Sequence, residues 1–315
     1  MGNSGDKLAA VEKISMSVHI APLFGDTLNA KGVYHFNCFE VMPEHKAEYD
    51  AVLSSQSQYA RGSKEYRDLQ DELDSFPMFK VWQDNIPAHN IVCTLGRNLI
   101  LDTALSGSAY TANVFMGLIS SVSLVNLSTT ISSGTYTTGT GAVSLTTAAA
   151  HGLTVGDSVT IASAAGTGSF AAINGTFTAT TGTTGSTLNF TVSATLTMTI
   201  TGGNVTTTSP TRIADTMAGH TNWTEAGSTN APTFAARVAP AFSAAANSSK
   251  STSTAVSFTM TGAGTLAGAF IAFGTGAVST LMSTTGTLLS AGAFTGGNQV
   301  VSNGNVVTVS YTLSQ

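Results

Sequence analysis

Charged side chains almost disappear from this sequence after its first third, and this loss most constrains what the chain can form. The segment from Met1 to Asp102 carries charges every few positions. Charged residues make up 9% of the whole chain, against about 25% in an average globular domain. A surface this poor in charge suits a protein that is packed against others better than a free monomer. The part after Asp102 holds six charged residues: Asp157, Arg212, Asp215, Glu225, Arg237 and Lys250.

Composition excludes disorder and several classes of partner. Disordered chains combine low hydrophobicity with high net charge, whereas this chain is 42% hydrophobic with a net charge of −5 and a mean hydropathy of +0.21. Because a nucleic-acid surface needs clustered Lys and Arg, no nucleic acid partner is expected. The most apolar run, 266–282, is broken by glycines and is short for a membrane-spanning helix. Its core, 267–273, reads as a strand buried on both faces, so no membrane partner is expected either. Cys38 and Cys93 lack metal-ligand spacing and are predicted to be buried thiols.

The predicted fold class is mainly β, with a β-sandwich or jelly-roll-like main domain. In the last strand-like run Val307, Val309, Tyr311 and Leu313 point one way and the residues between them the other. Short strands joined by Gly or Asn turns are typical of sandwiches and jelly rolls. Four such runs close the chain: 254–262, 266–274, 286–294 and 305–313. Three more segments are also expected to be β: 79–84, 90–107 and 114–121. The main domain is therefore assigned to 80–127 and 209–315.

A small β module is expected to be inserted into this domain at 128–208. The insert is rich in Ser, Thr and Gly, and pieces such as SVTIAS (158–163) and LNFTVSAT (188–195) read as strands. A turn at His151-Gly152 precedes them. The imidazole could be a ligand or a base, but no Cys, Glu or second His lies nearby in the module. We therefore predict that His151 bonds local backbone and that Asp157 alone makes no site.

Residues 1–79 are predicted to form an N-terminal arm with two amphipathic helices, 43–56 and 63–76. A strand-like piece, 34–39, precedes them. In the second helix, which Ser63 is expected to cap, an apolar stripe runs along one face and most other positions are charged. Because electrostatic steering needs charge, the arm is the expected docking element. The competing interpretation is that the helix only covers its own β domain. The candidate partner contacts are Tyr66, Leu69, Leu73, Asp68, Asp71 and Glu72, with Asp74 beside them.

No catalytic, cofactor-binding or metal-ligating residue is predicted, and the chain is not expected to be an enzyme. GAGTLA (262–267) matches a dinucleotide fingerprint formally, but a strand follows where a helix is needed. His220 lies near Asp215 and Trp223 in ADTMAGHTNWTEAG (214–227). A Ser-His-Asp arrangement is conceivable, yet nothing selects the serine. The favoured interpretation is a buried tryptophan with polar neighbours at a loop.

Several separate pieces, in the same order, resemble a family of virion structural proteins of tailed bacteriophages. The inserted region is similar to a small β module found in phage surface proteins and named for a half-domain of ubiquitin-activating enzymes. Asn305 departs from the family pattern, which more often has Asp at that position. The pieces are VWQDNIPAHNIVCTLGRNLILDTALSGSAYTANVFMGLISS, ADTMAGHTNWTEAGSTNAPTF, FTMTGAGTLAGAFIAFGTGAV, TGTLLSAGAFTGG and NGNVVTVSYTLS.

The resemblance implies a place in the virion, after assembly in the host bacterial cytoplasm. A capsid decoration or cement protein would bind the major capsid protein or other virion proteins, and we expect a homo-oligomer, either a dimer or a trimer. A head or tail fibre subunit for host attachment is the alternative, although the absence of long repeats or a coiled-coil stalk favours the compact option. A virion-borne glycan hydrolase is a remote alternative, because it would need paired carboxylates.

Overall fold

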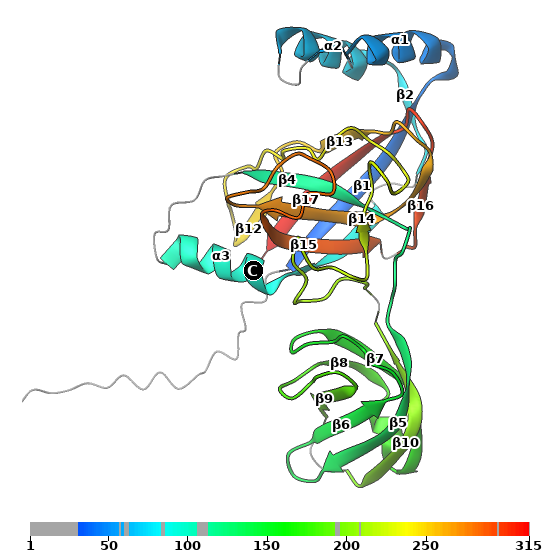
Figure 1. Cartoon of the computed structure of the whole chain (residues 1–315), viewed down its shortest axis with the longest axis vertical. Coiled ribbons are helices and arrows are strands. Elements are labelled where there is room, and N and C mark those ends of the chain that lie inside the picture. Colours follow the sequence, from blue (N-terminus) through cyan, green and yellow to red (C-terminus); the bar gives the residue numbers. More distant parts are fainter. Residues whose placement is uncertain are drawn as a thin grey trace, which may run out of the picture.

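The protein is mainly β in the computed structural model, as predicted, with 45% strand and 15% helix. The structure describes residues 31–56, 58–59, 63–82, 86–105, 113–192, 196–207, 209–294 and 296–314. Residues 1–30 of the predicted arm lie outside these ranges. Three units follow one another along the long axis: a helical hairpin, a large barrel-like sheet and a smaller sheet (Figure 1).

The main sheet has eleven strands and curls into a nearly closed barrel. Neighbouring strands follow the order β11-β4-β14-β15-β3-β1-β17-β12, while β2 pairs with β1, β13 with β17 and β16 with β14. The bounds are β1 (Lys31–Val41), β2 (Met78–Lys80), β3 (Ile86–Val92), β4 (Val114–Ser120), β11 (Thr224–Glu225), β12 (Ser249–Ser251), β13 (Val256–Thr259), β14 (Gly264–Phe273), β15 (Thr287–Phe294), β16 (Gln299–Val301) and β17 (Val306–Ser314).

An irregular segment between β11 and β12 closes the barrel. Met116 of β4 forms a bridge with Val238, and Phe234 forms one with Met260. Met260 follows β13, which pairs with β17, so these bridges connect the two ends of the sheet. Closure matters because an open edge would leave backbone N–H and C=O groups without partners. The sandwich-like prediction is confirmed, with the two facing layers belonging to one curled sheet.

The position of β1 corrects the predicted boundary of the N-terminal arm. This strand lies between β3 and β17, with Lys31 opposite Ser314. Its inward side chains Tyr34, Phe36 and Cys38 are fully buried in the barrel core. Residues 31–41 therefore belong to the main domain, and the boundary expected at 79/80 is wrong for them. Alternation identifies a strand, but it does not identify the sheet that receives the strand.

A helix corrects the prediction that 90–107 is β throughout. After β3 the chain forms α3 (Thr94–Leu105), which packs against β15. A Cβ at Gly96 would lie 2.7 Å from the carbonyl oxygen of Leu289, so glycine is what allows this close approach. Leu99 and Ile100 pack partly buried against the barrel core. A short apolar run does not distinguish a buried strand from a helix, which is why the prediction failed.

The central strand β14 is buried on both faces, as predicted for 267–273. Ile271 and Phe273 belong to the main core of the barrel. Phe270 and Ala272, which alternate with them along the strand, belong to a second apolar cluster that includes Trp223 and Met217. The loop that carries Trp223 therefore covers the other face of β14, and burying an aromatic side chain of this kind contributes about 1.5–3 kcal/mol.

The smaller sheet occupies the range expected for the inserted module and has a core of its own. Its strand order is β8-β7-β10-β5-β6-β9. Val143, Leu145 and Phe190 are among its buried side chains. The bounds are β5 (Ser128–Thr137), β6 (Ala142–Thr147), β7 (Ser158–Gly168), η2 (Phe170–Ile173), β8 (Gly175–Thr178), β9 (Thr187–Thr191) and β10 (Met198–Thr206).

The predicted helices 43–56 and 63–76 are confirmed and form a hairpin between β1 and β2. The first comprises η1 (Pro43–His45) and α1 (Lys46–Gln56), and the second is α2 (Lys64–Ser75). The hydroxyl of Ser63 accepts from the backbone N–H of Tyr66 at 3.1 Å, which confirms the predicted cap.

Candidate functional site

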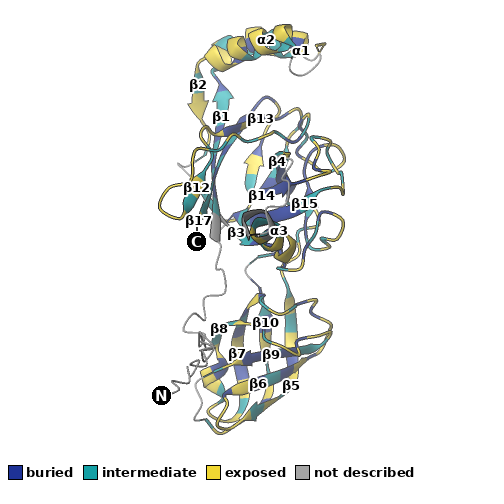
Figure 2. Ribbon diagram, turned by 90° about the vertical axis from the view of Figure 1, so that its left-hand side faces the viewer, coloured by how far each residue is buried: buried dark blue, intermediate teal, exposed yellow. Residues whose placement is uncertain are grey.

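The structure places the six candidate partner contacts on α2, at the end of the molecule that lies opposite the module (Figure 2). Leu73 is buried in a small cluster with Tyr49 of α1 and Val41 of β1, so this part of the stripe holds the hairpin together. Tyr66 and Leu69 are half-buried. The acidic candidates Asp68, Asp71 and Glu72 are all exposed. The stripe therefore packs at least in part on the neighbouring helix, while the acidic face is turned to solvent.

Part of the acidic face is already paired within α2. Lys64 forms an ion pair with Asp68 one turn on, and the amide of Gln70 donates to Asp74. Both side chains of the ion pair are well exposed, at 77% and 58%. Such exposed pairs contribute little to stability, so a partner could replace the internal contact at small cost.

The polar cluster around Trp223 forms as predicted, with the tryptophan buried and the polar side chains at a loop. The indole Nε1 of Trp223 donates to Asp215 Oδ2 at 2.9 Å, and the backbone N–H of Arg212 donates to the same oxygen at 3.0 Å. The ring of His220 stacks on the indole, with centroids 3.8 Å apart and planes at 13°. Burial raises the pKa of the Asp215 carboxyl despite these donors.

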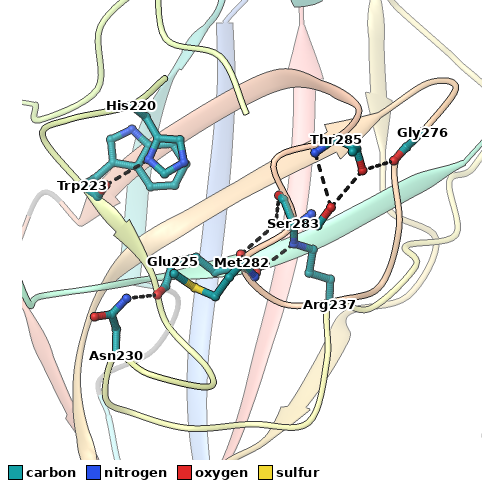
Figure 3. A network of polar contacts seen from close by, with 9 residues as sticks. All are labelled: His220, Trp223, Glu225, Asn230, Arg237, Gly276, Met282, Ser283 and Thr285. Carbon is teal, nitrogen blue, oxygen red and sulfur yellow. Dashed lines mark hydrogen bonds and ion pairs between the residues drawn. The ribbon is translucent and has the colours of Figure 1, made fainter. Parts of the chain in front are cut away.

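A buried ion pair between Glu225 and Arg237 lies beside this cluster and was not predicted from the sequence. The Arg237 guanidinium binds the Glu225 carboxylate in a bidentate way: Nε donates to Oε1 at 2.8 Å and Nη2 donates to Oε2 at 2.7 Å (Figure 3). The guanidinium also lies 5.2 Å from the ring centre of Phe270. The sequence signal that could have predicted this pair is two opposite charges, Glu225 and Arg237, 12 residues apart in a part of the chain with very few charges. Charges there can be buried only if they pair.

The same pair fastens the loop between β14 and β15. Glu225 Oε2 accepts from the backbone N–H of Met282 at 2.7 Å, and Arg237 Nη2 donates to the carbonyl of Ser283 at 2.7 Å. Ser283 and Thr285 continue the network toward Gly276 (Figure 3). The ion pair thus holds the loop against the barrel.

A cleft of about 280 Å3 lies above the ion pair, between this loop and the loop at 217–221. Its floor is buried, with Trp223, Phe270 and Arg237 close to fully inaccessible, whereas its rim at Gly219 and Met282 is exposed. The lining residues are Met217, Ala218, Gly219, His220, Thr221, Trp223, Glu225, Arg237, Phe270, Met282, Ser283 and Thr284.

His151 and Asp157 lie where the module meets the main domain. His151 Nδ1 accepts from the backbone N–H of Leu153 at 3.0 Å, which confirms the predicted local bond. Burial lowers the pKa of the His151 imidazole. Asp157 accepts from the N–H of Thr154 within its own turn and from the N–H of Ile213 in the main domain, each at 2.8 Å. Its carboxylate therefore ties the two units together.

The two cysteines are buried free thiols, as predicted. Burial raises the pKa of Cys38 to about 12 and raises that of Cys93 strongly as well. Because the thiolate is the reactive form, neither side chain is a ready nucleophile or metal ligand. Within the described ranges, His, Cys, Asp and Glu side chains do not gather in groups of three that could hold a metal ion.

Comparison with known proteins identifies no relative. No family model, curated protein or solved structure matches this chain. None of the helices in the part of the chain that the structure describes is long and apolar enough to cross a membrane. Function must therefore be inferred from the geometry of the molecule.

Proposed function

We propose that this protein is a structural component of a tailed-phage virion, and specifically a capsid decoration protein that docks through its helical hairpin. The observation that carries the proposal is the separation of charge along the molecule. Exposed acidic side chains gather on the hairpin at one end of the long axis (Figures 1 and 2). In the β part, five of the six charged residues after Asp102 are buried: Asp157, Arg212, Asp215, Glu225 and Arg237.

This distribution favours binding over catalysis. The three carboxylates that follow Asp102 in the sequence serve structural contacts: Asp157 at the domain junction, Asp215 under Trp223 and Glu225 in the ion pair. A glycan hydrolase would need two carboxylates free to act on a sugar. A structural, non-enzymatic role is therefore the better proposal.

The docking partner would present a basic surface, as on a major capsid protein or another virion protein. Asp68, Asp71 and Glu72 face solvent, with the half-buried Tyr66 and Leu69 on the same helix. Each exposed ion pair contributes only about 0–1 kcal/mol. Many copies on one shell would add up, and salt would weaken attachment because exposed charges are screened. The outside of the segment after Asp102, where Lys250 is the one charged residue that is not buried, suits contacts between copies, as a dimer or a trimer.

A head or tail fibre subunit remains the second candidate, and one observation favours it. The module lies at the end of the molecule opposite the hairpin (Figure 1). A protein docked through the hairpin would hold the module away from the shell, where it could meet a host surface.

The test removes the hairpin without damaging the barrel. Truncation before Pro77 would also delete β1, a central strand. However, Val41 lies opposite Met78 and the N–H of Met42 donates to the carbonyl of Pro77, so an Asn-Gly turn can replace 43–76. We expect this variant to fold but not to decorate capsids of the encoding phage that were assembled without the protein.

A charge variant, Asp68→Asn/Asp71→Asn/Glu72→Gln, keeps the hairpin and removes only three of its acidic charges. It is the matched control that separates loss of charge from loss of the hairpin. These side chains are exposed, so the helix should persist while occupancy falls and becomes less dependent on salt. Occupancy equal to that of the wild type for the hairpin deletion, at both low and high salt, would show that attachment uses another surface.

A further inference from the structure

The inserted module meets the main domain over a small joint. The two units form separate sheets with separate apolar cores, and the chain passes between them only before β5 and after β10 (Figure 1). Leu127 and Thr207 pair where these two connections enter the module. Beyond that pair, and among the residues that the structure describes, one hydrogen bond joins the units: the N–H of Ile213 donates to Asp157 Oδ1 at 2.8 Å.

Apolar packing across the joint is also limited. Ile213 lies against the backbone of Gly156, where an added Cβ would come within 2.9 Å of its Cδ1. Val155, in the same turn of the module, and Val125, on the first connection, remain 53% and 52% exposed. Domains that share a small interface with little buried apolar surface are expected to move relative to each other. The bond between Asp157 and Ile213 is therefore the contact that limits such motion.

The main-domain side of the joint is fixed independently of the module. The carbonyl of Ile213 accepts from the N–H and the hydroxyl of Thr94, at the start of α3, at 2.9 and 3.2 Å. At the other side, the N–H of Leu127 donates to the Thr207 hydroxyl at 3.1 Å and the N–H of Thr207 donates to the Leu127 carbonyl at 3.2 Å. Loss of the Asp157 contact would leave both attachments in place, with Leu127 and Thr207 as a pivot.

The loop 151–157, which carries Asp157 and which we call the latch loop, also contains a histidine that must be neutral in this structure. His151 Nδ1 accepts from the backbone N–H of Leu153 at 3.0 Å. A backbone N–H can only donate, so Nδ1 carries no proton. Leu153 is buried in the core of the module. A proton on Nδ1 would break this bond and displace the latch loop where it reaches Ile213.

The surroundings of His151 also disfavour its charged form. Burial is the main cause that lowers the pKa of the imidazole, and the positive charge of Arg212 acts in the same direction. The backbone of Thr187 and the carboxylate of Asp157 act in the opposite direction without compensating. The charged and titratable side chains around the joint are Asp157, Arg212, Asp215, Cys93 and Arg97.

We propose that the latch loop is an acid-sensitive latch: protonation of His151 releases Asp157 from Ile213, and the module then swings as a folded unit about Leu127 and Thr207. An open joint hydrates the imidazole, whose pKa then returns toward its usual value of about 6.5. Below that pH, one proton raises the ratio of open to closed molecules by up to about tenfold per pH unit. This inference concerns the joint and does not depend on the docking role of the hairpin.

The experiment measures the distance between two spin labels on the full chain by pulsed electron paramagnetic resonance between pH 8 and pH 5. The labels are attached to Thr191→Cys on the module and Lys250→Cys on the main domain, both exposed, while the native thiols are buried. We expect one narrow distance distribution at pH 8 and a second, broader population that grows below about pH 6.5. A distribution that stays narrow at pH 5, or is already broad at pH 8, would overturn the proposal.

Two variants test the latch itself. His151→Asn keeps an acceptor for the N–H of Leu153 but cannot take up the proton, so its distribution should stay narrow at pH 5. Asp157→Ala removes the acceptor for Ile213 and should show the broad population already at pH 8. Broadening of His151→Asn at pH 5 to the same extent as the unsubstituted chain would show that another group is responsible.

Amide exchange of Val143 and Leu145, in the core of the module, distinguishes swinging from unfolding. Their protection should persist at pH 5 while the distance distribution broadens. Loss of that protection together with the broadening would show that the module unfolds, and would refute the latch.

Discussion

Replacing Glu225 with Gln should destabilise the barrel by about 3–5 kcal/mol, because it leaves the Arg237 guanidinium buried without its counter-charge. Glu225 is 3% exposed and Arg237 is 1% exposed, so water cannot compensate for the loss. The carboxylate also accepts from the N–H of Met282. The substitution therefore weakens both the ion pair and the attachment of the loop between β14 and β15.

A double-mutant cycle separates these contributions. Arg237→Met alone should also cost about 3–5 kcal/mol, since it leaves Glu225 buried and unpaired. The double variant Glu225→Gln/Arg237→Met should cost clearly less than the sum, because replacing both charges by groups of similar size is often close to neutral.

Urea unfolding followed by tryptophan fluorescence measures these effects. The chain has two tryptophans, and both Trp82 and Trp223 pack in the clusters of the barrel, so the signal does not report the module. Asp68→Asn, which breaks an exposed pair on α2, is the control and should cost no more than about 1 kcal/mol. A cost below about 1 kcal/mol for Glu225→Gln, or additive single variants, would refute the reasoning.

Two further predictions concern the module. In Asp157→Asn a single amide oxygen replaces the two carboxylate oxygens that now accept from the N–H groups of Thr154 and Ile213. The substitution should therefore lower the free energy of unfolding by about 1–3 kcal/mol and speed amide exchange at Thr154 or Ile213. Unchanged exchange at both residues would contradict the role of Asp157 in joining the module to the main domain. Because burial lowers the pKa of His151, the unfolded chain takes up a proton at a higher pH than the folded one, and stability should fall as pH drops below about 6.5. His151→Asn keeps an acceptor for Leu153 and should flatten this dependence in urea unfolding followed by far-UV circular dichroism; an equally steep loss would exclude His151 as its cause.

Local features of the fold could be read from the residues alone, because each depends on neighbours in the chain. The alternation at the C-terminal end predicted the inward side of β17, where Val307, Val309 and Tyr311 are buried. Ser63 caps α2 as expected. His151 also makes the predicted bond to local backbone. Strand periodicity, capping and turn chemistry act over a few residues, so the amino-acid order is sufficient to specify them.

The pairing of distant segments was decided only in the folded chain. Nothing in the run 34–39 indicates that β1 must pair with β17, although Lys31 lies opposite Ser314. Likewise, Gly96 lets α3 approach β15 closely, a contact that depends on the backbone of Leu289. A period of two or 3.6 tells which side of an element is apolar, but not what will cover that side.

For the candidate site, too, some features could be predicted from the sequence and others were decided only in the folded chain. The order of residues placed the exposed acidic side chains on one helix and marked Asp215, His220 and Trp223 as a cluster. It did not indicate that Arg237 would form an ion pair with Glu225, or that this pair would lie beneath a cleft with Met282 at its rim. A buried charge selects its partner by desolvation and by the geometry of converging loops. Both arise only when the barrel closes and brings those loops together.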